Sequence, residues 1–360
     1  MEMRNLKAWQ EDLHRCIRCG YCFEGCPIIK ELEWEVDGAR GKVVMAYGLL
    51  VGDLEASEYI AEKMFQCTFC KDCVERCSAN VSIPDILSAV RADFWDHGFA
   101  LEEHKALLKI IDSSGNIFNQ ALKPPERKGK TPVLLGCRFL ERKKDADRYL
   151  KLLHKLGIQS RTFDEVCCGM PFAVLGDKQG FENQKKKFID KLPDENQELI
   201  CVCTTCIFFI QKKYPELKAK YVIEEIVERL PQIKTKIKKL GITATYHDPC
   251  NVARGLDMVD EPRWLLKELG VELKEMKTYG KEATCCGGGG GMMVSDVALS
   301  DQLAENRVQE ALDTGAAYLV TLCPTCEVNL KKAAEKNHSP IQVKNVLDLL
   351  YEAVVGNGKK

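Results

Sequence analysis

The sequence lacks long hydrophobic runs, and neither sign of charge predominates. Its longest uncharged apolar stretch, Val43–Gly52, is about half as long as a membrane span. The 52 Lys and Arg residues nearly balance the 53 Asp and Glu residues, which argues against a nucleic-acid partner or an acidic membrane surface. Residues Met1–Arg15 contain no apolar segment, so we expect no secretory signal. These absences predict a cytoplasmic protein that has no membrane span of its own.

Cysteine, by contrast, is abundant, at 19 of 360 residues. A disulfide-rich secreted scaffold is a poor match, because such scaffolds are short and are exported to an oxidising compartment. In a reducing cytosol, clustered cysteines more often bind metals or carry electrons. Hydrophobic residues make up 45% of this long chain, so we expect two or three folded domains rather than a disordered protein.

Composition divides the chain into a cysteine-rich, helical region at residues 1–122, a connector rich in Pro, Lys and Gly at 123–131, and an α/β region. In the last region short apolar runs alternate with amphipathic stretches, which is typical of βαβ units. We expect helices at Asp145–Leu156 and Pro262–Leu269, and strands at Pro132–Gly136, Ile158–Thr162, Leu199–Cys203, Thr243–His247, Val271–Met276 and Ala317–Leu322.

The α/β region contains an internal repeat. Each copy has a single cysteine, then a Cys-Cys-Gly triplet, then a Cys-x-x-Cys pair, and corresponding cysteines lie 113 to 120 residues apart. The first copy comprises Cys137, Cys167, Cys168, Gly169, Cys203 and Cys206, and the second comprises Cys250, Cys285, Cys286, Gly287, Cys323 and Cys326. We therefore expect a multidomain α+β protein in which a helical domain precedes two duplicated, Rossmann-like α/β lobes, at residues 132–236 and 237–360.

The helical region carries two bacterial-type ferredoxin motifs. The run Cys-x-x-Cys-x-x-Cys-x-x-x-Cys begins at Cys16 and again at Cys67, and Ser78 stands where Pro27 follows the first motif. In such runs three cysteines ligate one cubane [4Fe-4S] cluster and the fourth ligates the other. The expected ligands are Cys16, Cys19, Cys22 and Cys77 for one cubane, and Cys67, Cys70, Cys73 and Cys26 for the second. Zinc sites, the competing interpretation, use close pairs of cysteines separated by a longer gap.

The surroundings of these motifs favour electron transfer over catalysis. Between them, Gly41–Leu50 and Leu54–Met64 favour helices. No candidate general base or substrate pocket accompanies the eight cysteines, so we interpret this domain as an electron wire. Four histidines fall in charged helical stretches, and we expect them on the surface: His14, His97, His104 and His154.

In each α/β copy a glycine follows the adjacent cysteines, which permits a positive φ that brings both sulfurs to one centre. Each Cys-x-x-Cys pair follows an expected strand, where open α/β folds bind ligands. These Cys-Cys-Gly (CCG) motifs resemble those of the heterodisulfide reductase family. The order of ferredoxin and CCG motifs resembles that of the family's D subunit, which fuses the two parts, over nearly the whole chain. The flanking residues Arg40-Gly41-Lys42, Tyr246-His247-Asp248-Pro249-Cys250 and Cys285–Gly291 are similar to the usual context.

The resemblance implies one noncubane [4Fe-4S] cluster on five cysteines in each lobe. The implied ligands, which would form the catalytic sites, are Cys137, Cys167, Cys168, Cys203 and Cys206 in the first lobe and Cys250, Cys285, Cys286, Cys323 and Cys326 in the second, with Gly169 and Gly287 beside the clusters. Cys201 is left over, and we expect a buried apolar residue there or, alternatively, a ligand that replaces Cys203. Zinc bound by four cysteines of one lobe is the other alternative.

In that family the reaction is the two-electron reduction of a disulfide to two thiols, and in methanogens the substrate is the mixed disulfide of coenzymes M and B. We expect no flavin or nicotinamide on this chain, because Gly287–Gly291 lacks the spacing of a dinucleotide motif. This glycine run either lets the backbone approach a cluster or substrate, or forms a flexible loop. His247 and Asp248 either donate protons to departing thiolates or orient the turn before Cys250.

The resemblance also implies an electron-donor partner, which is a membrane cytochrome b, a flavoprotein or a hydrogenase-type complex. A membrane partner would hold the chain at the inner face of the membrane. The alternative function is an electron-transfer subunit of a flavin-dependent 2-hydroxyacid or glycerol-3-phosphate dehydrogenase complex. Relatives of that kind often have an incomplete CCG copy, so two complete copies favour the reductase. A redox sensor or scaffold without turnover is a third class.

Overall fold

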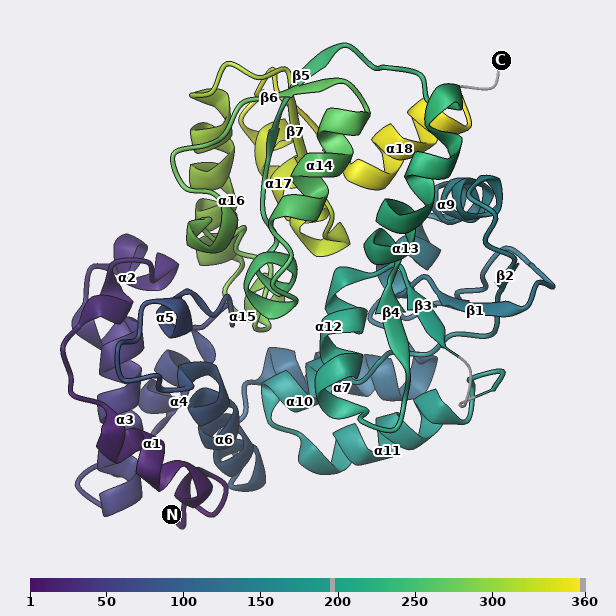
Figure 1. The fold of residues 1–360 in the computed structure, drawn as a ribbon. Helices are drawn as coiled ribbons and strands as arrows, with labels where there is room; N and C mark the ends of the chain where they lie inside the picture. The colour runs from purple at the N-terminus through teal and green to yellow at the C-terminus, as the bar shows by residue number, and fades with distance from the viewer. Residues whose placement is uncertain (195–197, 357–360) are drawn as a thin grey trace.

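The computed structural model describes residues 1–194 and 198–356. A helical part comes first, and two α/β lobes follow, each built on a four-stranded parallel sheet. Figure 1 shows the helical part, coloured purple to blue, beside the teal first lobe and the green-to-yellow second lobe. The expected α/β character of the chain after the connector is thereby confirmed. Within the described residues, no helix is both long enough and apolar enough to span a membrane.

The helical part packs around two of its longer helices, α3 and α6, which contact each other. Ser57 caps α4 by accepting a hydrogen bond from the Ile60 N–H at 3.3 Å, so this helix begins at Glu58, four residues later than expected. The elements are η1 (Leu6–Trp9), α1 (Gln10–Arg15), η2 (Tyr21–Phe23), α2 (Pro27–Leu32), η3 (Glu35–Asp37), α3 (Ala39–Val51), α4 (Glu58–Phe65), α5 (Asp72–Glu75), α6 (Ile83–Asp96) and α7 (Glu102–Ser114).

The first lobe follows an irregular connector, and its sheet has the strand order β2-β1-β3-β4. Its strands are β1 (Thr131–Leu134), β2 (Ser160–Arg161), β3 (Leu199–Cys201) and β4 (Ala219–Tyr221). Its helices are α8 (Cys137–Glu141), α9 (Lys143–Lys155), α10 (Met170–Leu175), α11 (Lys178–Ile189), α12 (Thr204–Lys213), α13 (Val222–Arg229) and η4 (Leu230–Lys236).

The second lobe has the equivalent order, β6-β5-β7-β8. Its strands are β5 (Ile242–Tyr246), β6 (Val271–Leu273), β7 (Tyr318–Thr321) and β8 (Gln342–Asn345). Its helices are the π-helical turn η5 (Asn251–Gly255), α14 (Asp260–Glu268), η6 (Gly280–Glu282), α15 (Met292–Ser295), α16 (Val297–Leu312), α17 (Pro324–Lys336) and α18 (Val346–Val354). Parallel pairing of all these strands requires crossover connections, which the helices supply.

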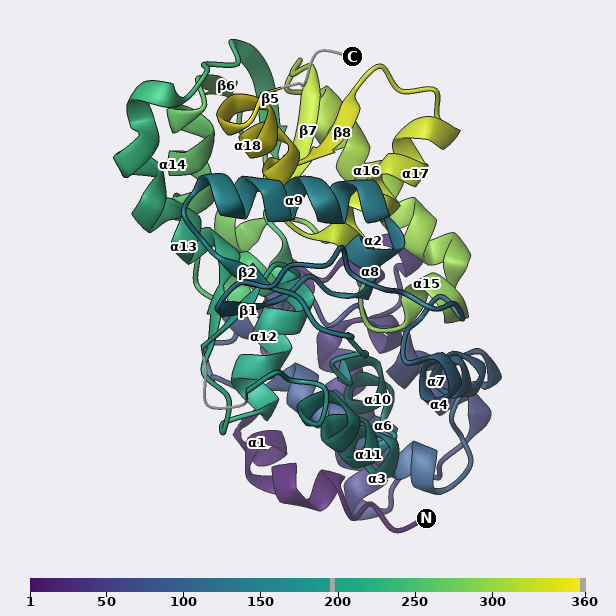
Figure 2. The same ribbon diagram turned by 90° about the vertical axis from the view of Figure 1, so that its right-hand side faces the viewer.

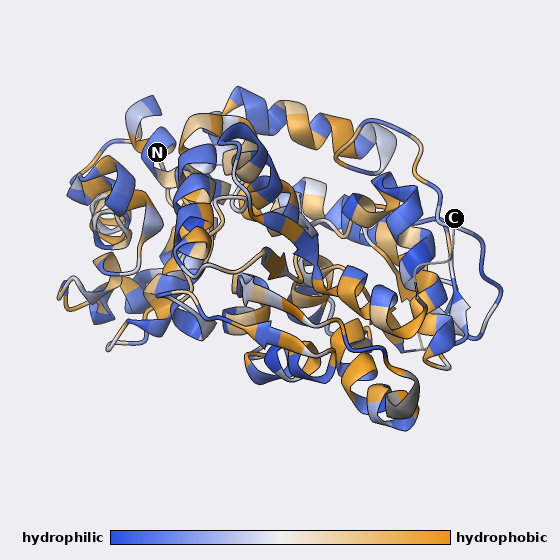
Figure 3. Cartoon of the chain, turned by 90° about the horizontal axis from the view of Figure 1, so that it is seen from above, coloured by the Kyte–Doolittle hydropathy of each residue, from blue (hydrophilic) through white to orange (hydrophobic). Residues whose placement is uncertain are grey.

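All six expected strands are present, although most are shorter than their apolar runs, and both expected helices are present as α9 and α14. The strands β4 and β8 were not expected. Each lies at an edge of its sheet, is three or four residues long and carries lysine, so neither shows the apolar run of a central strand. Elsewhere the helices alternate between hydrophilic and hydrophobic residues along their length (Figure 3).

One continuous apolar core joins the two lobes. It contains Leu150 of α9 together with Leu265 of α14 and Leu350 of α18, all fully buried. Helix α18, the last element of the second lobe, packs against α9 of the first, as Figure 2 also shows. Polar contacts cross the same seam, including the Tyr149 hydroxyl, which donates to the Asp348 carboxylate at 3.2 Å. The lobes therefore form one packed body and hold their cysteines in a defined relative position.

The expectation that His104 lies on the surface is wrong. Helix α7 packs against α15 of the second lobe, a long-range contact that the pattern of α7 itself does not show. His104 is fully buried there, with its ring 5.0 Å from that of Phe65, and burial lowers its pKa to about 4. The other three histidines, His14, His97 and His154, are exposed as expected.

Candidate metal centres

The eight cysteines of the helical part line two pockets. The outer pocket is lined by Cys16, Cys19, Cys22 and Cys77, and Cys19 is exposed. The inner pocket is lined by Cys26, Cys67, Cys70 and Cys73. Each pocket therefore gathers three cysteines of one motif and the last cysteine of the other. A donor set of four thiols facing one pocket fits a cubane cluster.

The backbone curls in the same way in both motifs. Arg18 and Phe69 occupy equivalent positions, each with φ of 57°, and Gly20 and Lys71 are likewise equivalent, with φ of 90° and 66°. Left-handed backbone at non-glycine residues costs about 1–2 kcal/mol per residue, so packing must hold it in place. This curl turns the thiols of each motif towards a common centre.

Buried cations surround the inner pocket. Lys42 lines it with a side chain that is 2% exposed, and Arg91 is fully buried beside it. Arg91 donates to the carbonyls of Phe65 and Cys67, at 2.7 and 3.3 Å, and to the Gly290 carbonyl of the second lobe at 2.9 Å. Burial lowers the pKa of Arg91 to about 10, so it remains cationic at neutral pH. The inner pocket is thus electrostatically prepared for an anionic group.

The five CCG cysteines of the first lobe meet at the carboxyl ends of its strands. Cys137 begins α8, and Cys203 caps α12. The thiols of Cys167 and Cys206 hydrogen-bond that of Cys168, which holds the Cys168 pKa well below its ordinary value. Burial raises the pKa of Cys137 to about 12. Gly169 has a φ of 84°, as the CCG turn was expected to require.

The second lobe gathers its five cysteines in the same way. The Sγ atoms of Cys286 and Cys326 lie 2.9 Å apart, and burial raises the pKa of Cys250 to about 12. Hydrogen bonds from Cys326 and from Thr204 of the first lobe lower the pKa of Cys323 to about 6. Gly287 has a φ of 79°. Because Thr204 follows Cys203, its contact with Cys323 places the two CCG sites next to each other across the lobe seam.

The glycine run packs against the ferredoxin motif. A Cβ atom on Gly289 would lie 2.1 Å from the Thr68 carbonyl oxygen, and one on Gly290 would lie 1.7 Å from that of Cys67. Any side chain here would prevent the contact, so the run serves a close backbone approach, one of the two interpretations offered above. The thiols of Cys70 and Cys285 also hydrogen-bond each other across this junction.

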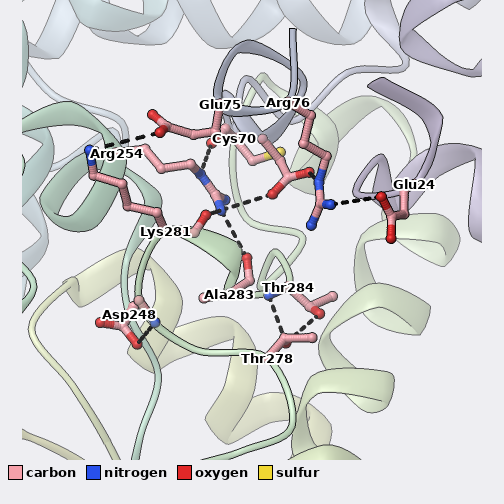
Figure 4. A network of polar contacts seen from close by, with 12 residues as sticks. Glu24, Cys70, Glu75, Arg76, Asp248, Arg254, Thr278, Lys281, Ala283 and Thr284 are labelled. Carbon is pink, nitrogen blue, oxygen red and sulfur yellow. Dashed lines mark hydrogen bonds and ion pairs between the residues drawn. The ribbon is translucent and has the colours of Figure 1, made fainter. Parts of the chain in front are cut away.

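Arg254 ties the same two parts together (Figure 4). Its side chain is 1% exposed, and its Nε donates to the Cys70 carbonyl at 2.7 Å. Its Nη1 donates to the carbonyls of Lys281 and Ala283, at 2.6 and 3.1 Å, and pairs with Asp72 at 3.3 Å. The inner pocket and the second-lobe cysteines are therefore held in contact by a buried guanidinium.

Lys71 marks the point where the helical part meets both lobes. Its Nζ lies 3.2 Å from the centre of the Phe208 ring of the first lobe and donates to Asn251 of the second at 3.1 Å. Burial lowers its pKa to about 8. Sequence reasoning did not single out Lys71, Arg91 or Arg254, since their partners lie far along the chain. The buried apolar state expected for Cys201 is confirmed, because it is fully buried.

Asp248 orients a turn. Its carboxylate pairs with Arg263 through two contacts, at 2.8 and 2.9 Å, and accepts the Gly280 N–H at 2.8 Å. Its neighbour His247 is also buried, and one ring nitrogen lies within 4.8 Å of the Sγ atoms of Cys286 and Cys326. For Asp248 these contacts favour the structural interpretation over proton donation.

Comparison with known proteins agrees with this arrangement. A 4Fe-4S dicluster domain matches residues 12–81, and one cysteine-rich domain, CCG, matches twice, at residues 133–211 and 244–331. The chain is 26% identical to the D subunit of a dihydromethanophenazine:CoB–CoM heterodisulfide reductase from Methanosarcina barkeri, over 98% of this chain and 97% of the relative. The chain is an iron–sulfur protein of the heterodisulfide reductase family and is similar to its D subunit. It is an electron-transfer protein with an oxidoreductase role.

Two further similarities place this result in context. The chain is 28% identical to the B subunit of a fumarate reductase (CoM/CoB) from Methanothermobacter marburgensis, over 94% of this chain and 72% of the relative. A crystal structure of a hypothetical Helicobacter pylori protein aligns with 99% of this chain and 72% of its own, with a TM-score of 0.58 and 10% identity. That second likeness shows the fold alone.

Proposed function

We propose that this chain reduces a disulfide to two thiols, with electrons that pass from the helical part to the two CCG sites. The observation that carries the proposal is the unbroken series of cysteine contacts. Cys70 of the inner pocket hydrogen-bonds Cys285, and Cys323 of the second-lobe site hydrogen-bonds Thr204, which adjoins Cys203 of the first. Two complete CCG sites beside each other suit a substrate that splits into two sulfur fragments.

The proposed ligands are those expected from the motifs. Cubane clusters would occupy the outer and inner pockets, and one noncubane cluster would occupy each set of five CCG cysteines. Such clusters supply one-electron transfer and iron that attracts sulfur. The buried, mutually hydrogen-bonded thiols fit this role, because deprotonated thiols need a compensating positive charge at these depths. Zinc in one lobe is the alternative cofactor.

We also propose that the chain consists of a helical unit at residues 1–122, a connector at 123–131 and two duplicated lobes at 132–236 and 237–360. The repeated CCG match and the equivalent strand order of the two sheets support this division. The close fit of Cys67 and Thr68 against the glycine run makes the helical unit and the second lobe act together. The chain would receive its electrons from a partner protein.

Iron analysis is the first experiment. Four clusters predict about sixteen iron atoms per anaerobically purified chain, whereas about eight would leave only the cubanes. The Cys203→Ala variant should lose iron from the first lobe, while the matched Cys201→Ala variant should keep the full content. Equal losses in the two variants would contradict the assignment of Cys203 over Cys201.

Activity is tested with the coenzyme M–coenzyme B heterodisulfide and reduced viologen as the electron donor. Each disulfide should take up two electrons and two protons and release two thiols. A fully metallated chain that releases no thiols would contradict the reductase. An electron-transfer role beside a separate catalytic protein would then stand as the function, and the relative named as part of a fumarate reductase favours it as the second candidate.

A further inference from the structure

His247 stands at the carboxyl end of β5 and is 1% exposed. Its backbone N–H donates to the Val320 carbonyl at 2.9 Å, which extends the pairing of β5 with β7 and fixes the residue beside the second-lobe cysteines. One ring nitrogen and the Sγ atoms of Cys286 and Cys326 all lie within 4.8 Å of one another. The imidazole therefore belongs to the wall of the second-lobe site, although CCG ligation makes no use of it.

Arg307 determines which nitrogen of this ring carries the proton. It is fully buried, and its Nε donates to His247 Nδ1 at 3.0 Å. Its Nη1 is held by Glu310 at 2.6 Å and by the Thr278 hydroxyl at 2.9 Å. A guanidinium only donates, so Nδ1 must accept and the proton of the neutral ring must sit on Nε2. This Nε2–H is buried and has no hydrogen-bond partner among the described residues.

The first lobe has no such device. His247 precedes Cys250 by three residues, and the residue that precedes Cys137 by three is Leu134. Arg307 follows Cys286 by 21 residues, and the residue at that distance from Cys168 is Ile189. Both counterparts are apolar, so the two CCG sites differ in hydrogen bonding although their cysteines match.

We propose that His247, oriented by Arg307, donates its Nε2–H to sulfur in the second-lobe site and makes this site the stronger electron acceptor of the two. The inference rests on the proposed function. A donor directed at sulfur stabilises the negative charge that reduction adds, and hydrogen bonds to sulfur raise the potentials of iron–sulfur centres. The second-lobe site is also the one whose Cys285 contacts Cys70, so electrons leaving the inner pocket meet the stronger acceptor first. His247 is a positioning residue and not a ligand.

Hyperfine spectroscopy tests the hydrogen bond directly. In full-length, reduced chain labelled with ¹⁵N-histidine, we expect one weak ¹⁵N coupling to a noncubane signal. The His247→Leu variant should lose it, although the other five histidines remain. A strong coupling, as in iron–nitrogen ligation, or no coupling at all would overturn the proposal, and the wild-type spectrum alone decides between these results.

Potentiometry tests the consequence. The His247→Leu variant should lower the potential of one noncubane centre by at least about 59 mV, equivalent to a tenfold change in its one-electron reduction equilibrium. The other noncubane centre should not change, and His247→Gln, which retains an N–H donor, should recover most of the loss. Unchanged potentials, or equal shifts at both centres, would overturn the proposal. Iron analysis separates the two levels, since fewer than about sixteen irons per wild-type chain contradict the proposed function itself.

Discussion

At the scale of single residues, the informative positions are buried cations beside buried thiols. Lys42 and Arg91 flank the inner pocket, whereas Arg40 flanks the outer one. Lys42 is 2% exposed, while the Arg40 side chain is 25% exposed and pairs with Glu35 at 2.8 Å. Solvent and the Glu35 carboxylate screen Arg40, so its charge acts weakly on the outer pocket. The buried charge of Lys42 acts at a lower effective dielectric constant and therefore more strongly.

The Lys42→Met variant should lower the reduction potential of the inner-pocket centre. Loss of one charge at a few ångströms from a buried centre is worth about 1–2 kcal/mol at an effective dielectric constant near 20. The matched Arg40→Met variant should shift the outer-pocket centre by much less. Redox titration of both variants, at wild-type iron content, measures these shifts. A larger effect at Arg40 would contradict the electrostatic difference between the pockets.

At the scale of elements, short loops at the ends of strands and helices bring the parts together. The glycine run lies between η6 and α15 and packs on the loop before α5. It contributes backbone alone, which allows two main chains to come closer than side chains would permit. The docking of the helical part therefore depends on the absence of Cβ atoms at two positions, Gly289 and Gly290.

The Gly290→Ala variant should destabilise this docking. Its Cβ would lie 1.7 Å from the Cys67 carbonyl oxygen, at a residue with a φ of 66°. Gly315 has the same φ with nothing within 4 Å of a Cβ, so Gly315→Ala isolates the backbone cost of about 1–2 kcal/mol. We expect Gly290→Ala to cost about 1–3 kcal/mol more, from overpacking. Thermal unfolding compares the variants, and equal Tm values would show that the contact is dispensable.

At the scale of the whole molecule, the two lobes are held by a shared core and by ion pairs across their seam. Arg142 of the first lobe donates to Glu327 at 3.0 Å, and Glu327 is 5% exposed and also accepts from Asn345 at 3.1 Å. Glu327 directly follows Cys326 in α17. The seam that joins the lobes thus adjoins the second-lobe site, and its loosening should separate the two CCG sites.

The Arg142→Leu variant should destabilise the chain by about 2–3 kcal/mol. It leaves a buried carboxylate without its cation, and the cost stays below that of a fully buried pair because the Arg142 side chain is 24% exposed. The double variant Arg142→Leu/Glu327→Leu should regain much of the loss, since no unpaired charge remains. Chemical denaturation followed by fluorescence measures both. A double variant as unstable as the single one would attribute the effect to packing instead.

Sequence reasoning reached the central strands, the CCG turns and the grouping of ferredoxin cysteines into two pockets, because spacing and local backbone rules govern these features. It missed the edge strands β4 and β8, which lack apolar runs, and it misplaced His104, whose burial depends on the packing of α7 against α15. It also left open the glycine run and His247, whose partners Thr68 and Arg307 are distant in the chain.

The sequence by itself determined the inventory of thiols, their order and the turns that gather each set, since these depend on residues a few positions apart. Only the tertiary structure decided that the inner pocket meets the second lobe at Cys70 and Cys285, that buried arginines bridge the parts, and that one CCG site has a histidine donor where the other has leucine. The physical reason is that burial and long-range hydrogen bonds arise when distant segments pack, and local spacing does not encode which segments those are.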